Sequence, residues 1–227
     1  GTYDFKTDCY VTKSSTGTES INSGALHTYV GMTSNGTNRT FLKVTMPSLQ
    51  SGDVITKAYL NLVAAANTVM GTGEYKIDAH KITADWTTST VSFDYPHDSN
   101  VLDYALIPAT DAYVYSWNIT SCAKEWQVNG GNYGILLKGA TESGIVGRRF
   151  YTYKNTADVL RPYVTVYYIN TTGLNDYNSY KTYDYGTYGT LYLNEYSGNS
   201  TYIFNDVNYG GNLLSTSIYH VYNSDSY

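Results

Sequence analysis

The chain has 227 residues and a net charge of −5, and only 15% of its residues are charged, so Ser, Thr, Asn, Gly and 27 tyrosines supply most of its polar side chains. This length suffices for one large β domain, or for a medium domain and a smaller piece, with no disulfide or metal needed for stability. The acidic balance and the lack of a Lys/Arg cluster exclude an ordinary nucleic-acid-binding surface, and no apolar run approaches the roughly 18 residues that membrane insertion requires.

Alternation of apolar and polar residues dominates the first two-thirds of the chain and predicts short strands. In chain order these lie at 10–13, 27–32, 41–46, 54–66, 75–82, 91–94, 113–119, 133–138, 148–153 and 163–169. Gly- and Asn-rich turns separate them, and no helical pattern is interleaved. The sequence therefore predicts an all-β fold, an antiparallel, jelly-roll-like β-sandwich with one short helix.

That helix is expected over 122–128. Thr120 or Ser121 can cap its first amides, and Gly130 provides a left-handed stop. Cys122 and Trp126 are four residues apart, so both can face the core. Cys9 and Cys122 are expected to be small buried apolar residues, with a disulfide between them as the alternative.

The composition changes near residue 170. Residues 170–227 hold one basic residue and many tyrosines, with short strands expected at 191–193, 202–204 and 217–222. This predicts two domains, 1–169 and 170–227, the second a small β-rich C-terminal extension. It has too few aliphatic residues for a core of its own, so it should either lean on the first domain or be partly disordered.

Three segments of residues 1–169 together resemble DNRLRE domains, which are sandwich modules of bacterial surface proteins and of some carbohydrate-binding proteins. They are NRTFLKVTMPSLQSGDVITKAYLNL, then ADWTTSTVSFDYP with Trp86, and then WNITSCAKEWQVNGGNYGILLKG followed by DVLRPYVTVYY. The chain departs from the family at Tyr153-Lys154-Asn155, where a more acidic turn is common. An ion site known near that turn in relatives is therefore not carried over.

The rest of the chain is similar to the segment that leads into the Rhs/YD repeats of wall-associated proteins. The similarity covers YINTTGLNDYNSYKTYD and GTLYLNEYSGNSTYIFNDVNYGGNLLSTSIYHVYN. Such proteins are long bacterial polypeptides whose repeats form a β shell around a C-terminal toxin. The resemblance implies a secreted or cell wall-associated location and a downstream Rhs/YD-repeat shell, in a polymorphic toxin, as partner. The missing initiator Met and signal peptide likewise predict that the chain begins inside a longer protein or after processing.

Residues that could carry catalysis are isolated from one another. Glu74, Glu125 and Glu142 are expected to be surface carboxylates rather than an acid–base pair. The four histidines, His27, His80, His97 and His220, form no zinc-binding or metalloprotease motif. We therefore expect no catalytic residues and no enzyme activity.

Calcium is the one cofactor that the sequence suggests. Asp94, Asp98 and Asp103 place three hard oxygen donors in the segment DYPHDSNVLD, and Asn175-Asp176 begins a similar group. Turn-forming Asp and Asn are the favoured alternative.

The aromatic residues leave two functions to compare. Tyr113, Tyr115 and Trp117 share one face of a strand and are expected in the core, as are Trp86 and Trp126, whereas tyrosines beyond residue 170 are expected to be exposed. The leading hypothesis is a non-catalytic structural or adhesive module of an Rhs-type surface protein, in contact with a cell-wall polymer or another glycan. The alternative is a calcium-stabilised carbohydrate-binding module. A glycan hydrolase or lyase would need Glu125 or Glu142 and is not expected.

Overall fold

Two antiparallel sheets pack face to face to form the larger part of the molecule. The computed structural model describes residues 2–4, 7–49, 52–65, 71–109, 113–170, 172–174, 178–210 and 215–224. The chain divides into two compact units, an N-terminal unit of Gly1–Ser48 and Ile55–Tyr167 and a C-terminal unit of Leu49–Val54 and Tyr168–Tyr227. Each unit is described by itself.

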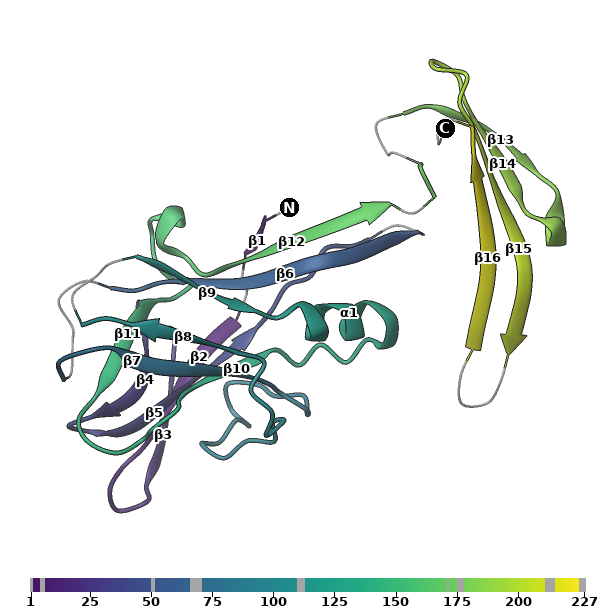
Figure 1. Cartoon of the computed structure of the whole chain (residues 1–227). Coiled ribbons are helices and arrows are strands. Elements are labelled where there is room, and N and C mark those ends of the chain that lie inside the picture. The colour runs from purple at the N-terminus through teal and green to yellow at the C-terminus, as the bar shows by residue number, and fades with distance from the viewer. Residues whose placement is uncertain are drawn as a thin grey trace. The chain divides into compact units, whose positions relative to one another are not determined.

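The N-terminal unit is an antiparallel sandwich, as predicted (Figure 1). Its smaller sheet has the order β1 (Thr2–Asp4), β12 (Tyr163–Asn170), β6 (Asp53–Val63), β9 (Val114–Asn118). Its larger sheet has the order β11 (Gly147–Tyr151), β4 (His27–Thr33), β5 (Gly36–Lys43), β10 (Ile135–Gly139), β7 (Tyr75–Lys81), β8 (Asp103–Ile107). A further hairpin joins it, because β2 (Thr7–Lys13) pairs with both β5 and β3 (Glu19–Ser23).

The core between the sheets is fixed by alternating apolar side chains and one indole hydrogen bond. Leu60 of β6 lies opposite Trp117 of β9, and both are fully buried. The indole N–H of Trp117 donates to the carbonyl of Ile77 at 2.9 Å, so it ties the smaller sheet to the larger one. A buried tryptophan stabilises the fold most when its N–H finds such an acceptor.

A second apolar cluster covers another face of the larger sheet. Phe41 and Leu42 are consecutive residues of β5, and both are fully buried, so side chains cover this strand on both faces. Phe41 packs edge-on against Trp86 with ring centroids 5.9 Å apart, and Val91 and Phe93 belong to the same cluster. The segment 83–102 therefore serves as a third layer over this part of the sheet.

That packing explains one wrong prediction. Residues 91–94 are not a strand. The amide of Val91 bonds to the carbonyl of Thr87, and the amide of Phe93 bonds to the carboxylate of Glu19. Val91 and Phe93 both face the core, as their alternation suggests, but they belong to a loop and not to a hydrogen-bonded strand.

The helix α1 (Thr120–Asn129) forms where the sequence predicts it. Cys122 and Trp126 face the core, and Gly130 ends the helix with φ 69°, as expected. The predicted cap is wrong, because the N-cap residue is Ile119, and the amide of Thr120 donates to the side-chain oxygen of Asn118 at 3.0 Å. The hydroxyl of Thr120 instead accepts the amide of Ala58 at 3.0 Å, so it connects the helix to β6.

Both cysteines are free and buried. Burial raises the pKa of the Cys9 thiol to about 12 and that of Cys122 to about 11. The prediction of two small buried apolar residues is confirmed, and such thiols are poor nucleophiles.

The C-terminal unit contains an antiparallel sheet of β13 (Tyr180–Asp184), β14 (Thr190–Asn194), β15 (Ser200–Gly210) and β16 (Ser215–Asn223) in that order. The strands expected at 191–193, 202–204 and 217–222 lie within the last three. Tyrosines with large exposed areas are common in it, as expected, among them Tyr185, Tyr188, Tyr196 and Tyr222. Across the described residues, no helix has the length and apolar character to span a membrane.

Candidate functional site

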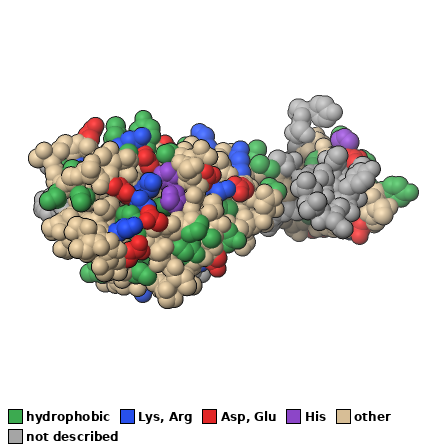
Figure 2. Space-filling model, turned by 90° about the horizontal axis from the view of Figure 1, so that it is seen from below, with side chains coloured by type: hydrophobic (Ala, Val, Ile, Leu, Met, Phe, Trp, Pro, Cys, Tyr) green, Lys and Arg blue, Asp and Glu red, His purple; other side chains and the backbone are tan. Residues whose placement is uncertain are grey.

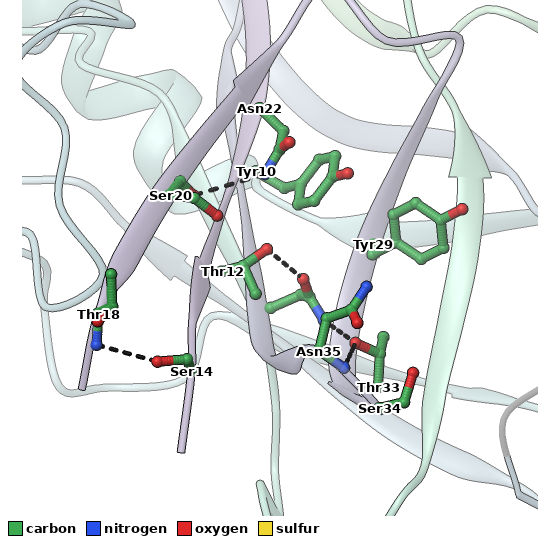
Figure 3. A pocket seen from close by; sticks show the side chains of 11 residues that line it. Tyr10, Thr12, Ser14, Thr18, Ser20, Asn22, Tyr29, Thr33, Ser34 and Asn35 are labelled. Carbon is green, nitrogen blue, oxygen red and sulfur yellow. Dashed lines mark hydrogen bonds between the residues drawn. The ribbon is translucent and has the colours of Figure 1, made fainter. Parts of the chain in front are cut away.

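An open hollow of about 370 Å³ lies over β2, β3, β4 and β5 of the N-terminal unit (Figure 3). We call it the groove. Its eleven lining residues are Tyr, Thr, Ser or Asn, so every one of them is uncharged and carries a hydrogen-bonding group.

Strand register brings the lining side chains together. Tyr10 of β2 lies opposite Asn22 of β3, and Thr12 lies opposite Ser20. On the other side of β2, Thr12 lies opposite Asn38 of β5. Because side chains alternate along a strand, these residues share one face of the sheet and form consecutive polar rows.

The floor of the groove is held rigid by Asn38. Its side-chain oxygen accepts the hydroxyl of Thr12 at 2.7 Å, and its amide nitrogen donates to the carbonyls of Gly31 at 3.0 Å and Gly36 at 3.1 Å. Asn38 is buried, and these bonds fix its rotamer. The polar groups around it are thus positioned before any ligand arrives.

Two tyrosines form the wall of the groove. The rings of Tyr10 and Tyr29 meet edge to face, with centroids 5.3 Å apart and planes at 64°. Both side chains are half-buried, and neither phenol makes a hydrogen bond within the described structure. Burial, together with the neighbouring Tyr29, raises the pKa of Tyr10, so it remains a neutral phenol that can donate and accept.

Charged side chains of the same strands point to the opposite face. Lys13 lies opposite Glu19, and Arg39, next to Asn38 in β5, forms ion pairs with Asp94 at 2.9 Å and Glu142 at 2.7 Å. Beside the groove, Arg149 of β11 lies opposite Tyr29 of β4. On the face of the N-terminal unit seen in Figure 2, acidic and basic side chains lie next to one another, among uncharged polar surface.

The structure does not bring the three predicted calcium ligands together. Asp94 accepts bonds from Lys13 and Arg39, Asp98 binds the amide and side chain of Asn100 at 2.9 Å, and Asp103 accepts the amide of Asn118 at 2.7 Å. The ion pair with Lys13 is the main reason why the pKa of Asp94 is lowered. In the described ranges no three His, Cys, Asp or Glu side chains form a group that could hold a metal. Asn175 and Asp176 lie outside the described residues.

The glutamates considered for catalysis have other partners. Glu125 binds Lys81 at 2.8 Å, and Glu74 is exposed in a turn. Glu142 differs from the surface carboxylate that the sequence predicts, because it is largely buried in a two-bond contact with Arg39. Glu125 and Glu142 thus pair with different cations, and the structure does not bring them together as an acid–base pair.

The aromatic predictions are partly correct. Trp86, Trp117 and Trp126 are buried, as expected, whereas Tyr113 has 66% of its surface exposed and is not a core residue. Tyr10 and Tyr29 were not singled out by the sequence. The signal for them was present in the polar alternation of Tyr10, Thr12 and Ser14, on the face of β2 opposite the buried Cys9 and Val11.

A sandwich with a preformed, uncharged polar groove has the features of a binding module. The comparison with protein families agrees, because the model of carbohydrate-binding module family 96 matches residues 2–168. The chain belongs to this family, whose members are non-catalytic, glycan-binding domains. No curated protein matches the chain. Of the two functions weighed from the sequence, the family supports the carbohydrate-binding module over the structural or adhesive one.

Proposed function

We propose that the N-terminal unit binds a glycan in the groove, through Tyr10, Tyr29 and the polar rows of β2 and β3. The observation that carries this proposal is the composition of the groove, which pairs two aromatic faces with uncharged donors and acceptors. Sugars present the same combination, since their rings have apolar C–H faces and an edge of hydroxyl groups. Ligand sites commonly join an apolar surface to a few well-placed polar groups in this way.

The two tyrosines have different parts in this binding. Because their rings stand at 64° to one another, a sugar stacked on one ring meets the edge of the other. The phenol hydroxyls and the side chains of Ser20 and Asn22 then contact the hydroxyls of the sugar. Asn38 contributes by holding Thr12 in place, because its own donors are already used by Gly31 and Gly36.

The test is a glycan array followed by calorimetric titration of the full chain with any glycan that is retained. Tyr10→Ala and Tyr29→Ala should each weaken binding about tenfold or more, which corresponds to about 1.4 kcal/mol. The control Tyr113→Ala removes an exposed tyrosine that lies just before β9, outside the groove, and should leave the affinity unchanged. If all three variants bound the glycan as tightly as the wild type, the groove would not be the binding site.

The relation to DNRLRE domains and to an Rhs-type surface protein is a further part of this proposal. It is supported by the motifs quoted above and by the sequence of residues 170–223, and it implies an extracellular or cell-surface location in a bacterium. In that setting, glycan binding would attach the polypeptide to a cell-wall polymer. Retention of the chain on isolated peptidoglycan or teichoic acid, and loss of retention in Tyr10→Ala, would test the attachment.

A further inference from the structure

Two histidines outside the groove come together although they are 17 positions apart in the chain. His80 lies on β7, and His97 belongs to the segment 83–102 that covers the second apolar cluster. Their ring centroids are 5.4 Å apart, with an angle of 77° between the planes. The segment is aligned with β7 at this point by the bridge between Ile82 and His97 and by the amide of Asp98, which donates to the carbonyl of Lys81 at 2.8 Å.

Hydrogen bonds fix the tautomer of both neutral rings. Nδ1 of His80 lies 2.9 Å from the carbonyl oxygen of Asp98, and Nδ1 of His97 lies 2.7 Å from that of Tyr95. Since a carbonyl can only accept, each Nδ1 carries the hydrogen in a neutral ring. Each Nε2 is therefore left with a lone pair.

The lone pair of His80 has no partner. His80 is 3% exposed, and its Nε2 is buried without a hydrogen bond. Leaving a buried acceptor unpaired is costly, so such an atom points to a group that occupies the site.

We propose that His80 and His97 bind a late first-row divalent metal ion, with Zn²⁺ as the biological occupant, through their two Nε2 atoms. Imidazole is a preferred ligand of Zn²⁺, Cu²⁺ and Ni²⁺, and metal-bound histidines usually donate their other nitrogen to a carbonyl, as both do here. Two imidazoles on one tetrahedral ion, each with a Zn–N bond of about 2.0–2.1 Å, place their centroids about 5 Å apart, close to the spacing of this pair.

The surroundings set the strength of this site. Within the described residues no third His, Cys, Asp or Glu joins the pair, so water must complete the coordination from the side of the half-buried His97, and we expect weak binding. Asp78, two residues before His80 on the same face of β7, contributes a nearly buried carboxylate, but Lys76 at 3.5 Å and Lys138 across the β7–β10 pair offset its charge. The bound ion would fasten residues 95–98 to β7 and thereby hold Val91 and Phe93 on the core.

The test is calorimetric titration of the full chain, carrying no polyhistidine tag, with ZnCl₂ at pH 7.5. One Zn²⁺ should bind and raise the melting temperature. His97→Gln and His80→Gln should each weaken binding about tenfold or more, whereas the control His27→Gln, whose ring packs on Tyr151, should bind as the wild type does.

His97 is half-buried, so His97→Gln is expected to fold even if His80→Gln does not, and the circular dichroism spectrum and melting temperature without metal verify this. Cu²⁺ gives a second readout, because its visible absorption should shift on binding to imidazole nitrogen in the wild type and not in His97→Gln. Absence of saturable Zn²⁺ binding, or unchanged binding in folded His97→Gln, would overturn the proposal. Ca²⁺ should neither bind at this pair nor displace Zn²⁺.

Discussion

Arg39 lies on the face of β5 opposite the groove, in a network of charges. Its guanidinium binds both oxygens of Glu142, one oxygen of Asp94 and the carbonyl of Phe93, and it stacks over the Phe93 ring at 4.0 Å. Only 10% of its side chain is exposed. One residue thus connects β5 to the loop that carries Glu142 and to the segment that covers the second apolar cluster.

Replacing Arg39 by Met should therefore lower the free energy of unfolding by about 3 kcal/mol, because Glu142 is left partly buried and unpaired. The matched change Lys13→Met removes an ion pair with the same Asp94 from a more exposed position and should lower the free energy of unfolding much less, because solvent screens the pair. Urea denaturation of both variants measures the difference. Similar losses of unfolding free energy in the two variants would show that burial of the charge network contributes little to stability.

Asp8 gives the chain a dependence of stability on pH. Its carboxylate is 2% exposed and accepts the amide of Tyr153 at 3.0 Å. Burial raises its pKa from 3.8 to about 6, although the Tyr153 amide and Lys154 act in the opposite direction. The folded state therefore binds the proton more tightly than the unfolded state, and the contribution of Asp8 to stability is lost as the pH rises through about 6.

In Asp8→Asn the charge is removed while an oxygen remains for the Tyr153 amide. At pH 7.5 the variant should be more stable than the wild type by up to roughly 3 kcal/mol, since each pKa unit corresponds to about 1.4 kcal/mol. Near pH 4 the two proteins should converge. Urea titrations at pH 4, 6 and 7.5 provide the comparison, and a difference that does not change with pH would contradict this account.

At the scale of elements, close backbone contacts decide where glycine is required. Gly134 precedes β10 with φ +96°, and a Cβ there would overlap the carbonyl oxygen of Leu42 in β5. Gly144 also has positive φ, at +76°, but nothing lies within 4 Å of its Cβ position. The two glycines differ only in the space around them.

Gly144→Ala should cost about 1–2 kcal/mol through backbone strain alone. Gly134→Ala should cost a further 1–3 kcal/mol, approximately, because β5 and β10 must move apart. Thermal unfolding of the two variants measures this. Equal losses of stability would mean that β5 and β10 can move apart without a free-energy cost.

The strands that the sequence predicted are rich in apolar residues. β6, β7 and β10 are examples, although β7 and β10 are buried on both faces, and the prediction of an antiparallel sandwich with one helix followed from such strands. β8 was missed because Tyr104 and Leu106 are exposed and obscure the alternation of Ala105 and Ile107. β3 was missed because Ile21 is its only apolar residue and is exposed.

The groove could not be predicted for the same reason. Ser20 and Asn22 line the groove only because β3 pairs with β2 in one register, and nothing local in their sequence specifies that partner. The histidine pair depends on a loop that returns along β7. Contacts of this kind are set by the tertiary fold, whereas burial of Trp86, Trp117 and Trp126 follows from residue type alone.

At the scale of the whole molecule, the two units differ in how they are stabilised. The N-terminal unit buries a continuous set of apolar side chains, from Cys9 to Val166. Among the described residues beyond 167, the buried side chains are polar, namely Thr172, Asn194 and Thr201. In the part of the C-terminal sheet whose side chains the structure describes, the backbone ladder is joined by aromatic contacts such as the pair of Tyr202 and Phe204, 4.1 Å apart.

A sheet with little apolar burial should open at a lower free energy than the sandwich. In native-state hydrogen exchange of the full chain, amides of β14 should therefore exchange at least about tenfold faster than those of β7 and β10, which lie in the interior of the larger sheet. Low concentrations of urea should accelerate the first group before the second. A glycan that binds the groove should slow exchange in β2 and β5 and leave β14 unaffected, because its binding energy would stabilise only the unit that contains the site. Uniform exchange across all these strands, with one common response to urea, would show instead that the two units unfold as one.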